Sequence, residues 1–138
     1  MKYVLSAGVI PVRHTPEGWR FLLLRAYRNW DFPKGMVEGP EDPLVAARRE
    51  AAEEADLHDL VFPWGDQYAE TQPYSRPKKV ARYYLAQTET EAIVLPVNPD
   101  LGRPEHHEGR WVDADEAVAL LPDRLQSVFD WARGVLRV

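Results

Sequence analysis

The sequence has 138 residues, 45% of them hydrophobic, and we expect residues 1–138 to form one domain with a substantial core. Its formal net charge is −5 at pH 7 and its sequence pI is about 5.4, which excludes a broad electrostatic surface for long nucleic acid. It contains no cysteine, which excludes disulfides, thiolate metal sites and a cysteine nucleophile.

The N-terminal third of the chain is predicted to contain two strands. Apolar runs predict them at residues 3–12 and 20–25, with a turn at 13–19. Gly8 inside the first run is typical of a close backbone approach or a bulge. The first run is too short for a signal peptide and no stretch is long enough to span a membrane, so we expect a cytoplasmic protein without a membrane partner. Residues 29–35, NWDFPKG, are predicted to be an irregular loop.

A helix is predicted to begin at Pro43, because Asp42 can cap its free N–H groups and proline suits the first helical position. Glu50, Glu53 and Glu54 are spaced so that they share one face of this helix. Like charges at such spacings destabilise a helix by roughly 0.2 to 0.5 kcal/mol per pair. A bound divalent cation would relieve this repulsion, because hard carboxylate oxygens suit Mg²⁺ or Mn²⁺, which in turn bind phosphate. An ordinary acidic surface helix is the alternative.

After the helix, strands are predicted at residues 60–70, 80–87 and 92–97, the first of them interrupted by Pro63. The loop between the first two reads TQPYSRPKK and is basic. Its cations, with one from the following strand, could face an anionic ligand, and scattered solvated charge explains them equally well. These residues are Arg76, Lys78, Lys79 and Arg82.

The last forty residues are predicted to form a turn at 98–104, a short strand that includes Trp111, and helices at about 115–121 and 125–136. His106 and His107 beside a glutamate could indicate zinc, but they are adjacent rather than spaced for one helical face, and further ligands are not near in sequence. Strands alternating with helices, two of them at the C-terminus, predict a mixed sheet between helices.

The stretch at residues 35–57 resembles the Nudix box, a pattern of a glycine, a glutamate, an Arg-Glu pair and a Glu-Glu pair at fixed spacings. The sequence matches it at Gly35, Glu41, Arg49, Glu50, Ala51, Glu53, Glu54 and Leu57. Asp56 replaces the glycine of the pattern at the helix end, where a left-handed residue usually sits, and aspartate tolerates that conformation better than most residues. The resemblance implies an α/β Nudix fold over essentially the whole chain: an α/β/α sandwich with a mixed, curved sheet and the box as a loop-helix-loop.

The resemblance also implies a function, Mg²⁺-dependent hydrolysis of a nucleoside diphosphate linked to another group, with Mn²⁺ as a substitute ion. Glu50 and Glu54 would be metal ligands, Glu53 a further ligand or orienting group, and either Glu50 or Glu54 the base for the attacking water. Arg49 precedes Glu53 by one turn and is expected to hold its carboxylate in a fixed rotamer. The expected partner is a small nucleotide or polyphosphate, and the protein would be a monomer or a homodimer.

WDFPKG and the Glu105-His106 pair before Trp111 resemble the diadenosine tetraphosphate hydrolase branch of the family. The resemblance implies that Glu105 supplies an extra carboxylate to the metal, that Lys34 lies near the phosphates, and that Lys78 or Lys79 is a second phosphate lysine.

Two positions depart from this branch. Asn29 replaces a histidine, and Gly109 replaces a tyrosine that often stacks on adenine. Loss of that ring forfeits roughly 1 to 3 kcal/mol of stacking unless Tyr74, Trp64 or another aromatic residue substitutes.

The sequence leaves three functions open. The first is asymmetric hydrolysis of dinucleoside polyphosphates. The second is the same chemistry on an oxidised or canonical nucleoside triphosphate, an RNA 5′ end or a diphosphoinositol polyphosphate. The third is a catalytically silent nucleotide-binding domain, which the intact set of acidic box residues disfavours.

Overall fold

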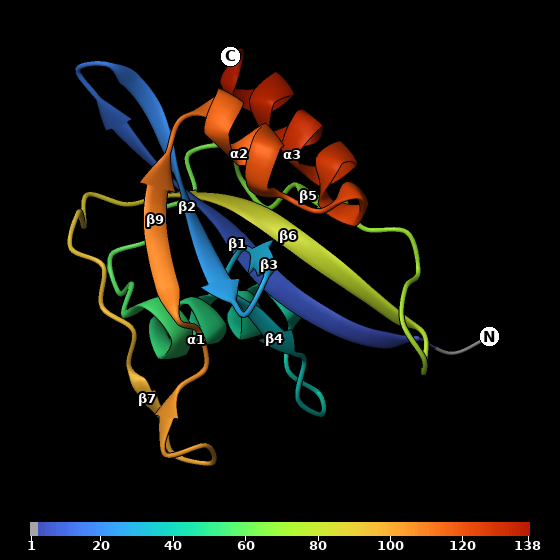
Figure 1. The fold of residues 1–138 in the computed structure, drawn as a ribbon. Coiled ribbons are helices and arrows are strands. Elements are labelled where there is room, and N and C mark those ends of the chain that lie inside the picture. The colour runs from blue at the N-terminus through green and yellow to red at the C-terminus, as the bar shows by residue number, and fades with distance from the viewer. Residues whose placement is uncertain (1–2) are drawn as a thin grey trace.

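In the computed structural model, which describes residues 3–138, a seven-stranded mixed sheet lies between helices on its two faces (Figure 1). The sheet has the order β3-β2-β1-β6-β5, with β4 also paired to β1 and β9 to β2, and β7 and β8 form a separate hairpin. The strands are β1 (Val4–Thr15), β2 (Gly18–Ala26), β3 (Asn29–Asp31), β4 (Lys34–Met36), β5 (Tyr68–Glu70), β6 (Lys79–Gln87), β7 (Val97–Asn98), β8 (Arg103–Pro104) and β9 (Glu108–Val112). The helices are α1 (Pro43–Ala55), α2 (Ala114–Leu120) and α3 (Asp123–Leu136).

Helix α1 covers one face of the sheet, and α2 and α3 cover the other (Figure 1). Side chains alternate along the strands and divide the core in two: Val9 packs with Ala47 and Ala51 of α1, whereas Ile10 packs with Phe129 of α3. The small alanine side chains let α1 approach the sheet closely. This arrangement confirms the predicted α/β/α sandwich with a mixed sheet.

Strand β1 is the centre of the sheet. It pairs with β2 and β4 in the antiparallel direction and with β6 in parallel. Gly8 makes the close approach that its position predicted, since a Cβ there would lie 2.2 Å from the carbonyl oxygen of Pro33 and 2.6 Å from Cβ of Lys34. The missing side chain therefore allows β4, which begins the loop before α1, to lie directly against β1.

Helix α1 begins and ends as the sequence predicts. Asp42 accepts a hydrogen bond from the N–H of Leu44 at 2.9 Å, and Pro43 is the first helical residue. Asp56 has φ 55°, so the aspartate in place of the usual glycine does adopt the left-handed conformation. Helices α2 and α3 and strand β6 also form close to their predicted positions.

Four predicted segments were wrong. The turn predicted at 13–19 is confined to residues 16–17, because β1 continues to Thr15 and pairs there with β2 from Gly18. Residues 29–35 are not irregular but contain β3 and β4, which are held by pairing with β2 and β1. Residues 60–70 form a strand only at β5, because Pro63 breaks the segment and leaves Val61 with an isolated bridge to Gln87. Residues 92–97 are not a strand before Val97; Leu95 packs against the core beneath α1, whereas Val94 is exposed.

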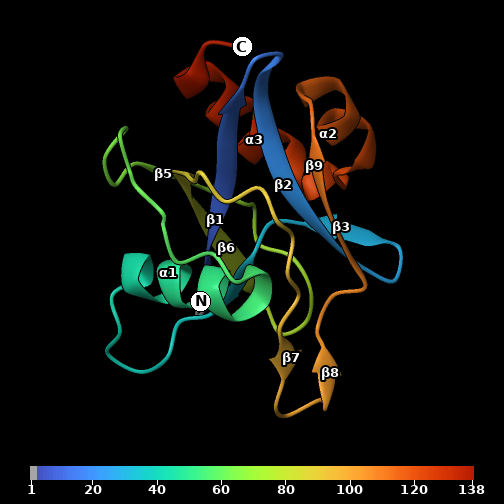
Figure 2. The ribbon, with the colours of Figure 1, turned by 90° about the vertical axis from the view of Figure 1, so that its left-hand side faces the viewer.

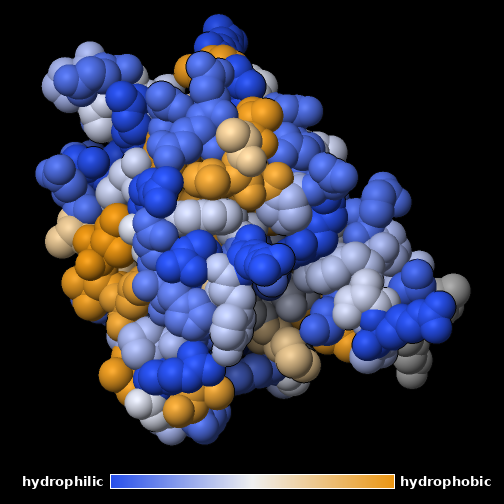
Figure 3. Space-filling view, in the orientation of Figure 1, coloured by the Kyte–Doolittle hydropathy of each residue, from blue (hydrophilic) through white to orange (hydrophobic). Residues whose placement is uncertain are grey.

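Figure 2 shows the β7–β8 hairpin extending below the sheet, beside α1. The visible face of the molecule is mostly hydrophilic, with an apolar patch over the segment that connects β6 to this hairpin (Figure 3). Ile93, Val94 and Val97 are exposed there. Within residues 3–138, no helix combines the length and the apolar character needed to cross a membrane.

Candidate metal centre

Helix α1 directs two of its three box carboxylates inward. Glu50 and Glu54 are buried, whereas the side chain of Glu53 is 58% exposed. The carboxylate of Glu50 lies against the backbone of Gly35, where an added Cβ would be 2.1 Å from Cδ of Glu50. Glycine is therefore required at this position so that β4 and the helix carboxylate can meet.

Arg49 links the loop before α1 to the helix itself. Its Nε and Nη2 donate to the two carboxylate oxygens of Glu41 at 3.0 and 3.1 Å, and Nη2 also donates to the carbonyl oxygen of Met36 at 3.1 Å. Its Nη1 donates to Glu50 at 2.7 Å and to Glu53 at 3.3 Å. The sequence predicted the contact with Glu53, but the closer partners are Glu50 and Glu41. Hydrogen bonds from Arg49 hold the pKa of Glu41 below its ordinary value.

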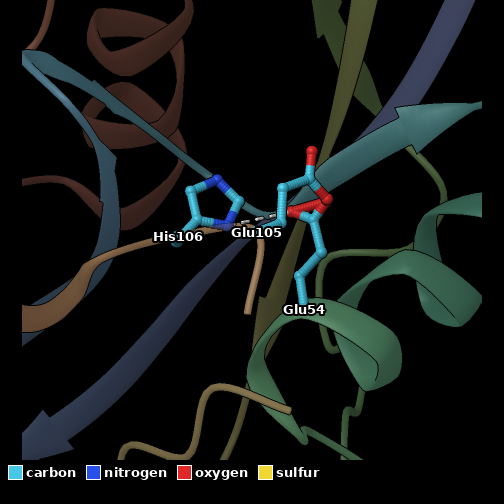
Figure 4. Close-up of side chains that lie close together, drawn as sticks. All are labelled: Glu54, Glu105 and His106. Carbon is cyan, nitrogen blue, oxygen red and sulfur yellow. Dashed lines mark ion pairs between the residues drawn. The ribbon is translucent and has the colours of Figure 1, made fainter. Parts of the chain in front are cut away.

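Glu105 comes from the segment before β9 and joins Glu54, together with His106 (Figure 4). One ligand atom from each of the three residues lies within 4.8 Å of the others. Nδ1 of His106 lies 3.8 Å from Oε1 of Glu54, and it is buried without a hydrogen-bond partner in the described part of the chain. The backbone N–H of Lys34 donates to the same Glu54 oxygen at 3.3 Å. His106, which the sequence analysis named in a doubtful zinc site and in the Glu105-His106 pair but gave no role as a ligand, thus belongs to the cluster.

Burial and mutual repulsion disfavour the ionised forms of the carboxylates in the cluster. Burial raises the pKa of Glu54 well above its ordinary value, and the neighbouring Glu105 and Glu50 raise it further. Burial also raises the pKa of Glu50, against the opposing effect of Arg49. Closely spaced oxygen donors of this kind suit a hard divalent cation such as Mg²⁺, and a bound cation would lower these pKa values again because it stabilises the ionised carboxylates.

A cleft of about 680 Å³ opens over these carboxylates. Strand β4 and helix α1 form one side, and residues around the β7–β8 hairpin form the other. Among residues 3–138, no aromatic side chain lines it, and the lining combines acidic residues with two basic residues and with aliphatic and proline residues. The residues that line it are Lys34, Gly35, Met36, Glu38, Arg49, Glu50, Glu53, Glu54, Pro96, Val97, Asn98, Pro99, Asp100 and Glu105.

Lys34 connects the cleft to a second group of charged residues. Its ammonium lies 3.3 Å from Oδ2 of Asp31, a buried carboxylate that also accepts hydrogen bonds from the Tyr83 hydroxyl at 2.7 Å and the Phe32 N–H at 2.6 Å. Nη2 of Arg124 donates to the same Oδ2 at 3.2 Å. Burial lowers the pKa of Lys34, but Asp31 and other neighbours outweigh burial and raise it overall. The sequence analysis missed Asp31, Tyr83 and Arg124. They come from three separate elements, β3, β6 and α3, so no regular spacing in the sequence connects them.

The predicted ligand-binding residues after β5 do not all lie together. The guanidinium of Arg124 lies 4.9 Å from the centre of the Tyr74 ring. The backbone of Tyr74 pairs with that of Lys79, so Tyr74 and Lys79 are the two ends of one turn. The exposed Lys78 lies in the same turn. Arg82 instead donates to Glu70 at 2.9 Å and lies over the ring of Tyr68.

Gly109 of β9 is packed tightly. A Cβ there would lie 2.6 Å from Cγ2 of Ile93 and 3.3 Å from Cδ2 of Leu24. The space that a side chain at residue 109 would fill is therefore occupied by the apolar segment that follows β6.

A family model described as NUDIX domain matches residues 2–132. The chain is 31% identical over 125 residues to the asymmetrical bis(5′-nucleosyl)-tetraphosphatase of Caenorhabditis elegans, covering 85% of this chain and 84% of that protein. It is 24% identical over 138 residues to an RNA pyrophosphohydrolase of Bartonella henselae, covering 83% and 79%. A solved C. elegans Ap4A hydrolase binary complex superposes with a TM-score of 0.79 at 26% identity, covering 96% of this chain and 98% of that one. The family match thus includes the whole sheet and every carboxylate of the cluster.

Proposed function

The chain belongs to the Nudix family of pyrophosphohydrolases, and from this premise we propose that it hydrolyses dinucleoside polyphosphates asymmetrically, for example diadenosine tetraphosphate to ATP and AMP. The observation that carries the proposal is that Glu54, Glu105 and His106 lie together, and that Glu54 and Glu105 line one cleft with Lys34, a phosphate-binding candidate. The relative that is 31% identical supports the choice of substrate.

Glu50, Glu53, Glu54 and Glu105 would hold Mg²⁺, or Mn²⁺ in its place. The bound ion would polarise a phosphoryl oxygen and lower the pKa of a water molecule. Arg49 keeps the Glu50 carboxylate in position through its 2.7 Å hydrogen bond, because the same guanidinium is anchored on Glu41. Glu54 suits the role of general base better than Glu50, because the Glu50 carboxylate accepts a 2.7 Å hydrogen bond from Arg49, whereas Glu54 accepts a longer one, at 3.3 Å, from the Lys34 N–H.

The phosphate chain would leave the carboxylate cluster past the ammonium of Lys34, a quarter of whose side chain is exposed. Lys78 and Lys79 on the next turn would meet phosphates farther along. Gly109 has no side chain on which a nucleotide base could stack, and Ile93 occupies the space beside it. Tyr74 is the aromatic candidate for that role, because it lies on the same side as Lys34 and Arg124.

The test is a steady-state panel with Mg²⁺ that ranks dinucleoside polyphosphates, nucleoside triphosphates, 5′-triphosphorylated RNA and diphosphoinositol phosphates by kcat/KM. We expect diadenosine tetraphosphate or its longer homologues to lead, with ATP among the products. Glu54→Gln should lower turnover by roughly 100-fold or more, because a ligand and base is lost. Glu89→Gln, which changes an exposed glutamate outside the cluster, is the matched control.

A second candidate is removal of pyrophosphate from an RNA 5′ end, which the Bartonella relative favours. The net charge of −5 disfavours it, because RNA binding draws most of its affinity from phosphate contacts with cations. The RNA ranking first in the panel would replace the dinucleotide assignment and leave the cluster chemistry unchanged. An inert panel would favour a silent nucleotide-binding domain.

A further inference from the structure

Two cations converge on a single oxygen atom next to the cleft that Lys34 lines. The Lys34 ammonium and the Arg124 guanidinium lie 3.3 and 3.2 Å from Oδ2 of Asp31. One cation comes from β4 and the other from α3, so the packing of α3 on the sheet brings them together. The two nitrogens are close enough for neighbouring phosphate groups of one chain to reach both.

The charges of this group do not balance. One carboxylate faces two cations, so a net positive charge remains, while Oδ1 is already satisfied by Tyr83 and by the N–H of Phe32. Asp31 is only 8% exposed, but the side chains of Lys34 and Arg124 are 25% and 29% exposed. The buried side of the group is therefore closed, and the excess positive charge faces solvent.

This group adjoins the cleft through Lys34. Lys34 lines the cleft, its backbone N–H donates to Glu54, and its ammonium pairs with Asp31 while it also lies near enough to Glu54 for that carboxylate to raise its pKa. The ring of Tyr74 flanks Arg124 and gives the group an apolar boundary. A linear anion anchored at the acidic cluster through a divalent cation would pass Lys34 before it reaches Arg124.

We propose that Arg124, held in place by Asp31, forms a second phosphate subsite beyond Lys34, which binds the distal phosphates of a polyphosphate chain. The inference rests on the proposed function for the identity of the substrate, and the subsite itself recognises the polyphosphate rather than the base. Guanidinium suits this role because it can offer two donors to one phosphate group. Long chains would gain the contact and short chains would not.

The direct test is binding of inorganic tetraphosphate at low ionic strength in EDTA, measured by calorimetry, which requires no hydrolysis. Arg124→Met retains the aliphatic stem and removes the charge, and should weaken binding about tenfold, the effect of one charge-assisted contact. Arg124→Lys should recover part of this loss. Arg133→Met changes another arginine of α3, remote from Asp31, and should bind as the unmodified protein does.

The second test compares KM for diadenosine tri-, tetra- and hexaphosphate. Arg124→Met should raise KM most for the hexaphosphate and least for the triphosphate. If tetraphosphate affinity falls while no dinucleotide is hydrolysed, the subsite stands and the proposed substrate fails. If Arg124→Met folds, as judged by circular dichroism, and neither the affinity nor the order of KM values changes, the subsite is overturned.

Discussion

At the scale of single residues, the site depends on a missing side chain as much as on charged ones. The carboxylate of Glu50 occupies the space that a Cβ on Gly35 would need, at 2.1 to 2.3 Å from the carboxylate atoms. The neighbour is a buried charged group held by Arg49, so it cannot move aside without losing its hydrogen bond.

Gly35→Ala should therefore lower kcat/KM by about 100-fold, because displacement of a catalytic carboxylate by a fraction of an ångström to 1 Å has that cost. The measurement is steady-state hydrolysis of the leading substrate. Gly134→Ala in α3 is the control: a Cβ there meets no atom within 4 Å, and alanine should raise stability by about 0.5 to 1 kcal/mol without changing activity. Equal activity in the Gly35 variant would show that Glu50 has room to relax.

Asp31 is a buried carboxylate that pairs with both Lys34 and Arg124. Asp31→Asn leaves the shape intact but removes the charge that Lys34 and Arg124 share, and should lower the free energy of unfolding by about 2 kcal/mol. Urea unfolding measures this. Asp130→Asn, an exposed aspartate on α3, should be neutral, and an Asp31→Asn midpoint as high as that of Asp130→Asn would contradict a structural role for the carboxylate.

At the scale of elements, α1 and the loop before it act as one unit. Arg49 is the link, since its guanidinium holds Glu41, the backbone of Met36 and Glu50 at once. The helix fixes the carboxylates relative to one another, and Arg49 fixes the loop relative to the helix.

Arg49→Ala should release this loop and lower kcat by about 100-fold, with a smaller effect on the unfolding midpoint. Amide hydrogen exchange should become faster at residues 37–41 and stay unchanged in β6. Arg48→Ala removes the neighbouring arginine, which lies over Phe62 instead, and should leave the loop protected. Loss of folding parallel to the loss of activity would instead make Arg49 a structural residue.

The elements that could be predicted from the sequence are those with local causes. Helix α1 has a cap, a proline and a spacing of glutamates that all act within a few residues, and its start and end were predicted correctly. Strands β3 and β4 have three residues each and exist because β1 and β2 offer partners, which no local pattern contains.

The site shows the same division. Glu50, Glu53 and Glu54 follow from helical spacing, and the position of Glu105 followed from resemblance to a family. Asp31 and Arg124 are 93 residues apart, and only the docking of α3 brings them together. The sequence does place Asp31 between two aromatic residues, in WDF. This could have indicated a cationic partner elsewhere in the chain, because a carboxylate in an apolar setting requires one.

At the scale of the whole molecule, buried carboxylates couple stability to pH and to metal. Glu54 and Glu50 have raised pKa values in the folded protein, whereas in the unfolded chain they ionise near the ordinary value of 4.5. As pH rises above 4.5 the unfolded chain loses these protons first, so the stability of the metal-free fold falls until pH reaches the folded pKa values, and the loss then persists at higher pH. A cation that binds the ionised forms reverses this effect.

We therefore expect Mg²⁺ to raise the Tm, relative to EDTA, more at pH 8 than at pH 5.5. Thermal unfolding at the two pH values measures this difference, and comparison with EDTA cancels the groups with lowered pKa values, such as Asp59 and Glu108. Glu54→Gln should reduce the pH dependence of the difference. A Mg²⁺ effect of equal size at both pH values would place the ion away from these carboxylates.

The central position of β1 also sets the order in which the molecule can assemble. Its hairpin with β2 closes between Thr15 and Gly18, which are near in sequence. Its other edge can pair only after β6 is in place, where Val4 pairs with the distant Lys79. Such distant parallel pairing is slow, because a long loop must close before any contact forms. On a ribosome the helix carboxylates emerge before their partner strand, and Glu105 emerges later still. A nascent chain therefore carries an unfinished cluster of like charges, and its capacity for a cation is completed only when β9 docks on β2.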